Sequence, residues 1–260
     1  DDTPVISSRE SAFDPYLFIT YTGQTGSPKT INVSHDAYLR KDQAARNYGG
    51  CTYMEFNGGG DADDRRPILY FDLSAIPSGA TITSALLKVH VTTAKTGTVT
   101  VRRLTRDWCL QATTCLCPNK VVEGDLNGAV PDSVGEGYGA TWDNYFYNAN
   151  SAACPWTTTG GDYYAASRGS LVMGSAAGWK TADITSLTQG WYASTIPFQG
   201  FALTSSSNTV ARIASRESAN KPYLSINYTT SQGSNISLSA RPLLTCDRGL
   251  ITVNMTVNSS

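Results

Sequence analysis

A fourteen-residue motif occurs twice in this chain and is predicted to be a β-strand in both places. Residues 8–21 are SRESAFDPYLFITY and residues 215–228 are SRESANKPYLSINY, with ten of the fourteen positions identical. The shared apolar residues stand two positions apart, which places them on one face of an extended strand. They are Leu17, Ile19 and Tyr21 in the first copy and Leu224, Ile226 and Tyr228 in the second. The chain therefore carries the same predicted core strand near each end.

Short alternating segments separated by turn residues continue between the two copies. We expect strands at residues 31–40, 51–56, 68–71, 85–91, 99–104, 170–173, 201–203, 211–214 and 223–228. Segments 85–91 and 99–104 are expected to pair as a hairpin. The single predicted helix covers residues 184–191, with Asp183 as its N-cap. Many short strands with almost no helical periodicity predict an all-β fold, a jelly-roll-type β-sandwich with terminal strand extensions.

The chain divides into three predicted parts. Residues 1–29 form an N-terminal arm with the first motif copy and a linker, residues 30–228 form the sandwich, and residues 229–260 form a tail. The tail ends in a clear alternation whose apolar residues are Ile251, Val253, Met255 and Val257. Such a strand needs a partner, because its apolar face and its backbone donors are both unsatisfied in isolation.

Composition excludes two classes of partner. Charged residues make up 16% of the chain and the formal net charge is -1, which argues against nucleic-acid binding and against a polybasic membrane patch. No apolar run approaches the roughly 18 residues that a membrane span requires. The sequence begins at Asp1 without a charged and apolar leader, and we interpret it as the mature form of an exported protein.

Six cysteines are an even number, compatible with three disulfides in an oxidising compartment. The candidates are Cys51, Cys109, Cys115, Cys117, Cys154 and Cys246. Their pairing cannot be chosen from sequence. A zinc site is disfavoured, because the cluster lacks the paired C-x-x-C knuckles of structural zinc sites.

Several motifs together resemble one known family. AYLRKDQAARNYG, RRPILYFDLSAIPSGATITSALLKVHV, ATWDN, GWKTADITSLTQGW, QGFALTS and ASRESANKPYLSINY occur in this order. They are similar to the DNRLRE domain, also classed as carbohydrate-binding module family 96 and related to disaggregatase-type repeats. The resemblance covers about residues 31–228 and leaves both ends outside it.

The resemblance implies a secreted or cell-surface β-sandwich without catalytic activity. Members of this family stand beside polysaccharide lyases and other modules in large extracellular proteins, and some bind acidic polysaccharides such as alginate. The cysteine-rich region at residues 109–154 departs from the family pattern, so a binding site of other members could be remodelled here.

Catalytic and metal motifs are few. The chain has two histidines, and no G-x-S-x-G or H-E-x-x-H motif is present, so we expect no enzyme activity. The loop GGGDADD places Asp61, Asp63 and Asp64 together, and their carboxylates could hold a structural calcium ion. The alternative is a solvated acidic loop between two strands. No other cofactor is expected.

Arginines and aromatic residues supply the candidate sugar site. Pyranose rings stack on aromatic faces, and guanidinium groups pair with uronate carboxylates. We expect glycan contacts from Arg65, Arg66, Tyr145, Tyr147 and Trp156. Other arginines of interest are Arg102, Arg103 and Arg106, of which Arg102 and Arg103 point to opposite faces of one strand. Trp142 and Trp191 are expected in the core.

Three functions are consistent with these observations. The leading hypothesis is a structural subunit of an extracellular filament or matrix. A duplicated terminal strand would be donated to an edge strand of an identical neighbour, and head-to-tail donation builds a fibre. The alternative is a carbohydrate-binding module for acidic polysaccharide from a larger cell-surface protein. An adhesin domain that uses both properties is the third.

Overall fold

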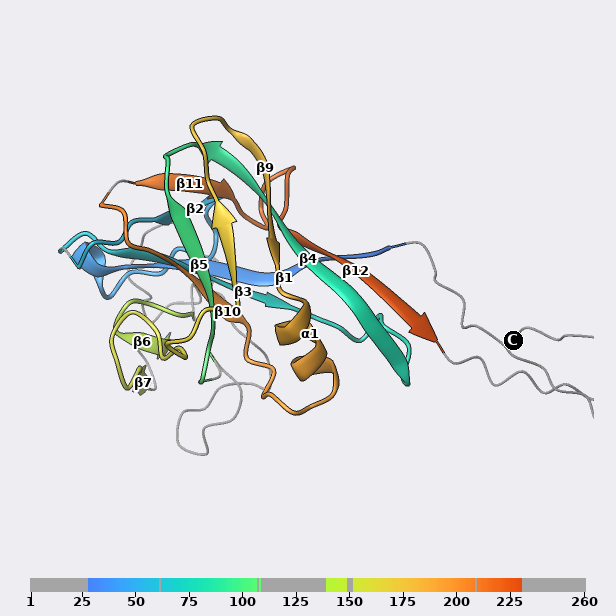
Figure 1. The fold of residues 1–260 in the computed structure, drawn as a ribbon. Helices are drawn as coiled ribbons and strands as arrows, with labels where there is room; N and C mark the ends of the chain where they lie inside the picture. Colours follow the sequence, from blue (N-terminus) through green and yellow to red (C-terminus); the bar gives the residue numbers. More distant parts are fainter. Residues whose placement is uncertain are drawn as a thin grey trace, which may run out of the picture. The chain divides into compact units, whose positions relative to one another are not determined.

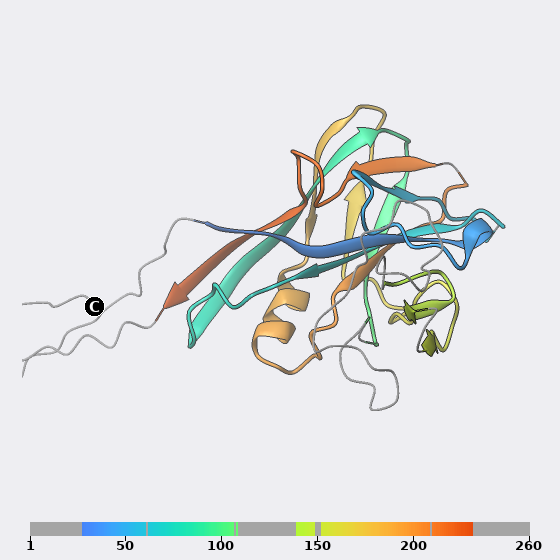
Figure 2. The same cartoon turned by 180° about the vertical axis from the view of Figure 1, so that it is seen from behind.

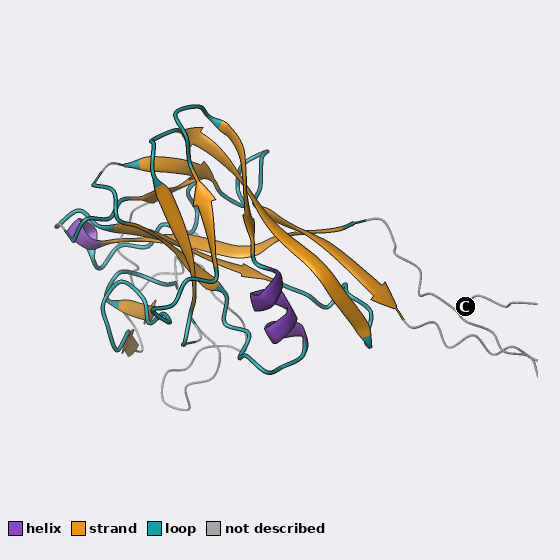
Figure 3. Cartoon of the chain, in the orientation of Figure 1, coloured by secondary structure: helices purple, strands orange, loops and turns teal. Residues whose placement is uncertain are grey.

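The computed structural model describes residues 28–60, 62–106, 108, 139–148, 152–208 and 210–230, and these lie in one compact unit, Thr25–Thr230. The strands are β1 (Lys29–Arg40), β2 (Tyr53–Phe56), β3 (Arg65–Phe71), β4 (Ala80–Thr93), β5 (Thr98–Arg103), β6 (Asn144–Asn148), β7 (Ala152–Pro155), β8 (Gly169–Val172), β9 (Gly178–Asp183), β10 (Phe201–Ser205), β11 (Ala211–Ala214) and β12 (Tyr223–Thr230). A 3₁₀-helix, η1 (Lys41–Gln43), and an α-helix, α1 (Thr185–Tyr192), complete the elements (Figures 1 and 3). The predicted all-β sandwich is confirmed.

The strands form two layers that share β1. In the first layer the order is β2-β11-β4-β12-β1, and β9 pairs with the other edge of β4; in the second the order is β1-β3-β10-β5-β8. Residues 29–32 of β1 pair with β12, and after an irregularity at Val33 and His35 the strand continues along β3. Figure 2 shows β1 crossing much of the domain. This strand therefore belongs to both layers.

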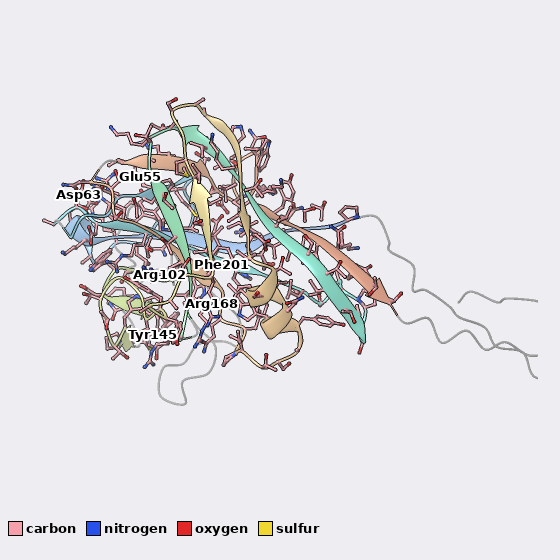
Figure 4. All side chains as sticks on the ribbon, viewed as in Figure 1. Glu55, Asp63, Arg102, Tyr145, Arg168 and Phe201 are labelled. Atoms are coloured by element: carbon pink, nitrogen blue, oxygen red, sulfur yellow. The ribbon has the colours of Figure 1, made fainter. Side chains whose placement is uncertain are left out.

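Alternation along the strands fills the space between the layers. Leu87, Val89 and Val91 of β4 are fully buried, and they contribute to one core cluster with Val101 and Leu203 of the second layer. Figure 4 labels Phe201, another fully buried member of this core, on β10. Trp191 of α1 packs on Phe201 with ring centroids 6.1 Å apart, and its burial confirms the prediction that it belongs to the core.

The predicted hairpin between residues 85–91 and 99–104 is wrong. The edges of β4 are occupied by β11 and β12 on one side and β9 on the other. β5 lies in the opposite layer, between β10 and β8. The four residues between β4 and β5 therefore connect the two layers rather than two adjacent strands.

The predicted helix is present, but its N-cap is displaced by one residue. Ile184 occupies the N-cap position, and α1 ends at Tyr192. Asp183 is the last residue of β9, and its Oδ1 accepts hydrogen bonds from the N–H and the hydroxyl of Thr185. The carboxylate still satisfies a donor of the first turn.

The second copy of the repeated motif contributes β12, which is an interior strand over residues 223–226. Tyr223–Ile226 pair with β1 on one side and with β4 on the other. The apolar residues Leu224 and Ile226 are fully buried, as the spacing predicts. The second copy has a paired strand on each side. The similarity of the first copy to it therefore gives no reason to expect the first copy to pair at a sheet edge.

The SRE part of that motif forms a turn at residues 215–218. The Ser218 N–H donates to the Ser215 carbonyl over 3.2 Å, and Arg216 forms an ion pair with Glu217 at 3.1 Å. The Arg216 backbone N–H donates to Oδ2 of Asp36 over 2.8 Å. Asp36 is only 1% exposed, so the turn is attached to β1 through a buried carboxyl group.

A smaller core cluster covers the outer face of the second layer. Outward-facing Ala37, Leu39, Ile68 and Ala202 pack against a segment that includes the hairpin of β6 and β7. That segment contributes Trp108, Trp142, Phe146, Cys154 and Trp156, all buried. Figures 1 and 2 show the hairpin at the end of the domain where η1 lies. These aromatic residues thus form a second layer of packing on one face of the sandwich, and Trp142 is confirmed as a core residue.

Several predicted residues lie outside the described part of the chain. They are Leu17, Ile19 and Tyr21 of the arm, Ile251, Val253, Met255 and Val257 of the tail, and Asp61, Cys109, Cys115, Cys117 and Cys246. The predicted strand donation therefore stays a prediction. Among the described helices, none has the length and apolarity needed to cross a bilayer.

Candidate functional site

A groove of about 450 Å³ opens on the outer face of the second layer, beside the smaller core cluster. Its lining includes Arg66 of β3, Thr100 and Arg102 of β5, Thr204 of β10 and Tyr163. The rest of the lining consists of Gly58, Gly59, Gly60, Asp64, Ser205 and Ser206. We call this the arginine groove. Figure 4 labels Arg102 within the domain.

Strand alternation explains why these polar side chains face outward. On β5, Val99 and Val101 are buried in the main core, so Thr100 and Arg102 point away from it. Thr204 of β10 pairs with Thr100. The Arg102 Nε donates to the Thr204 hydroxyl over 3.0 Å, which fixes the guanidinium group across the two strands.

The opposite wall is held by a turn that precedes Tyr163. The carboxylate of Asp162 accepts N–H hydrogen bonds from Thr157 and Thr158 and pairs with Arg106 at 2.9 Å. Burial alone would raise the pKa of Asp162, but these donors together hold that pKa below its usual value. The next residue, Tyr163, forms a bridge with Leu104 just after β5. The phenol ring is therefore positioned by backbone contacts and by a buried carboxylate.

Two guanidinium groups lie against the ring of Tyr163. The Cζ atoms of Arg66 and Arg102 are 5.4 Å and 5.8 Å from its centroid. Arg66 also lies 4.6 Å from the ring centroid of Trp142 and donates to the Gly160 carbonyl over 3.0 Å. These contacts leave both cations oriented and bordering the same hollow.

The groove retains positive charge after its internal ion pair is counted. Arg66 contacts Asp64 at 3.3 Å, with both side chains largely buried. Arg102 forms no ion pair within the described residues, and its donors beyond Nε remain available to a ligand. In the same part of the chain, Oδ1 of Asp64 is buried without a hydrogen-bond partner. The arrangement can pair with an anionic group.

The base of the groove depends on Gly58. A Cβ added there would lie 1.7 Å from the Ser205 carbonyl oxygen, and the Gly58 N–H donates to the Ser207 carbonyl over 3.0 Å. We expect Gly58→Ala to lower the free energy of unfolding by about 1–3 kcal/mol, because β10 must move away. At Gly60 an added Cβ meets nothing within 4 Å, so Gly60→Ala should cost only its backbone strain. Thermal denaturation of both variants tests this, and equal losses would contradict it.

The five predicted sugar-contact residues lie in different places, and only Arg66 lines the groove. Arg65 lies outside it and is held by Glu55 at 2.5 Å and by Asp63 at 2.6 Å. Tyr145 and Trp156 are 6% and 4% exposed in the smaller cluster, so the prediction that they stack on sugar rings is wrong. Figure 4 places Tyr145 at the β6–β7 hairpin, and Tyr147 lies on the same hairpin, away from the lining of the groove.

The arginines discussed beside them also separate. Arg103 lies 4.6 Å from the ring centroid of Tyr164, whereas Arg102 borders the groove, which confirms that the two point to opposite faces. Arg106 pairs with Asp162 and lies 5.1 Å from the ring centroid of Tyr145. Tyr163, Thr100 and Thr204 were missed by sequence reasoning. Their outward alternation was readable, but the pairing of β5 with β10 was not.

The acidic loop is engaged by arginines. Arg65 donates to Oδ1 of Asp63 through Nε and Nη2, at 2.9 Å and 2.6 Å. Asp64 is paired with Arg66, and Asp61 lies outside the described residues. Among the described residues, no group of three acidic, cysteine or histidine side chains could hold a metal ion. The calcium site stays a prediction, and its two described carboxylates already have cationic partners.

The described cysteines differ from each other. Cys154 is disulfide-bonded. Cys51 is a buried thiol in the main core, and burial raises its pKa to about 11. Cys51 therefore departs from the predicted set of three disulfides. The remaining pairing stays a prediction.

Comparison with known sequences identifies one family. Residues 27–115 match the model of carbohydrate-binding module family 96. The match spans β1 to β5, about a third of the chain, and it confirms over this segment the family identified from the motifs. Among curated proteins, none matches the chain.

Proposed function

We propose that this chain, which carries a family 96 carbohydrate-binding module segment at residues 27–115, binds a carboxylated polysaccharide in the arginine groove. The observation that carries the proposal is the pair of guanidinium groups, Arg66 and Arg102, that border one groove and flank the ring of Tyr163. A uronate chain presents a carboxylate on each sugar and hydroxyl groups between them. The module has no catalytic role in this proposal.

Each part of the groove has a function in recognition. Arg102 would donate paired hydrogen bonds to one carboxylate, because its guanidinium group is planar and already oriented by Thr204. Arg66 would contact a second acidic group or a ring hydroxyl. Thr100, Ser205 and Ser206 supply hydroxyl groups.

Replacing Arg102 tests the proposal. We expect Arg102→Ala to weaken binding of an alginate oligosaccharide about tenfold to a hundredfold in calorimetry, because hydrogen bonds to charged groups contribute about 1.5–3 kcal/mol. The dependence of affinity on salt should also decrease, since one cation is lost. Arg102→Lys should recover part of the affinity, because it restores charge without the paired donors.

The neighbouring residue provides a matched control. Arg103 is on the same strand, but it faces Tyr164 rather than the groove. Arg103→Ala removes the same charge and should leave the affinity within twofold of the unmodified protein. Equal losses for both variants, or no loss for Arg102→Ala, would overturn the proposal.

Modules of this type usually belong to extracellular proteins, so we propose an extracellular or cell-surface location with polysaccharide as the partner. Polymerisation with identical subunits is not supported by the family match. The strands predicted to be donated, at residues 8–21 and 251–257, lie outside the described residues.

A further inference from the structure

An exposed aromatic cluster lies on the outer face of the first layer, on the far side of the main core from the arginine groove. Trp179 of β9 is paired with His90 of β4, and their ring centroids are 5.2 Å apart at an interplanar angle of 75°. Tyr223 of β12 meets Trp179 at 5.2 Å and 67°. We call these three residues the aromatic platform. It joins three adjacent strands that are distant in sequence.

Strand alternation establishes that the platform faces away from the core. His90 stands between Val89 and Val91, which are both fully buried in the main core. Trp179 is 44% exposed, although tryptophan is a residue that folding usually covers. The rings of His90 and Tyr223 meet Trp179 edge to face and pack against the indole.

Polar groups surround the platform. Lys88 pairs with Thr181 on one side and Tyr223 on the other, and its ammonium group donates to the Thr181 hydroxyl over 2.8 Å. Within the described residues, Nδ1 of His90 is buried and has no hydrogen-bond partner. A single exposed indole bordered by a cation and hydroxyl groups is too small and polar for a stable protein interface. It does fit one sugar ring with its substituents.

We propose that the aromatic platform is a second sugar-binding surface, which takes a hexopyranose chain by stacking one ring on Trp179. The apolar face of a pyranose matches an indole, and Lys88 offers its charge to a carboxylate or a hydroxyl of the same chain. This surface uses none of the groove residues, so its binding goes beyond the function proposed above. Since the two surfaces face opposite ways, one molecule can hold two polysaccharide chains.

Binding at the aromatic platform can be measured separately by tryptophan fluorescence. The chain has five tryptophans, all among the described residues, and Trp108, Trp142, Trp156 and Trp191 are at most 4% exposed. Iodide should therefore quench Trp179 selectively. We expect an alginate oligosaccharide or a neutral cello-oligosaccharide to protect the fluorescence from iodide. Protection by either supports the proposal, and protection by neither overturns it.

Variants separate the two surfaces. In an Arg102→Ala background, Trp179→Ala should lower the remaining affinity for the protecting oligosaccharide about tenfold, as expected for loss of one stacking contact. Tyr164→Ala is a matched control, because Tyr164 is 45% exposed and lies outside the platform. Iodide protection that disappears in Arg102→Ala alone would overturn the second surface and leave the groove intact as a proposal. If the groove fails, Arg102→Ala has no effect on affinity while protection at Trp179 persists.

Discussion

Asp36→Asn is expected to make the protein more stable than the unmodified chain at pH 7. Burial, followed by the nearby Glu217 carboxylate, raises the pKa of Asp36 from 3.8 to about 8 in the folded protein. The backbone N–H of Arg216 and the charges of Arg216 and Lys221 act in the opposite direction. The folded state therefore keeps a proton that the unfolded chain releases at a much lower pH.

The sign follows from this difference in proton binding. The protonated form contributes its full stability below about pH 3.8, and the free energy of unfolding then falls by about 1.4 kcal/mol per pH unit until about pH 8. Asparagine cannot ionise, so the variant should lack this slope while its amide oxygen still accepts the Arg216 N–H. Denaturant unfolding between pH 4 and 8 measures the effect.

The comparison with the unmodified protein isolates Asp36 from other carboxyl groups. Asp42, Asp162 and Asp183 have lowered pKa values, and they give the opposite slope in both proteins. Asp72→Asn is a control, because this residue is exposed at the end of β3. Parallel pH profiles for Asp36→Asn and the unmodified protein would show that Asp36 is ionised in the fold.

Glu55→Ala is expected to lower the free energy of unfolding by about 3 kcal/mol, because it removes the buried partner of Arg65 and leaves this largely buried guanidinium group paired with the much more exposed Asp63 carboxylate. The Glu55 side chain is 3% exposed and contacts Arg65 of β3 at 2.5 Å and Arg212 of β11 at 2.8 Å. Since β11 and β3 lie in different layers, this carboxylate connects the two layers at one end of the sandwich. Figure 4 labels Glu55 and Asp63 there.

Asp63 provides the matched control for this network. Asp63 pairs with the same Arg65, but its side chain is 43% exposed, so Asp63→Ala should cost no more than about 1 kcal/mol. Chemical denaturation of the two variants at neutral pH measures the difference. A loss at Glu55 no larger than that at Asp63 would show that the buried pair contributes little.

Local pattern predicted most of the strands but missed β6, β7 and β9, and it could not show which strands lie next to each other. The segment 211–214 is observed as predicted, because a strand's position depends on its own alternation. The failed hairpin of β4 and β5 depended on which strands compete for the edges of β4, and those competitors follow more than 80 residues later. The short connection between β4 and β5 was the sole reason to predict that these two strands pair.

The candidate site illustrates the same limit. Arg66 and Arg102 were each recognised as candidate uronate ligands, but Trp156 and Tyr145 were assigned to the sugar site because pyranose rings stack on aromatic faces. These rings instead cover Ile68 and Ala202 on the outer face of a sheet. The sequence does not show that this outer face is apolar and has to be covered. Trp179 was not among the residues predicted to contact sugar. Its exposure depends on the pairing of β9 with β4.

The shared strand β1 and the order of its neighbours limit how this molecule could be shortened. Residues 27–115 contain β1 to β5, yet among these the only extended ladder joins β1 to β3. β12 separates β1 from β4, and β10 separates β3 from β5. An excised 27–115 peptide would thus lack the strands that join β1 to β4 and β3 to β5, so we expect it not to fold without the rest of the domain.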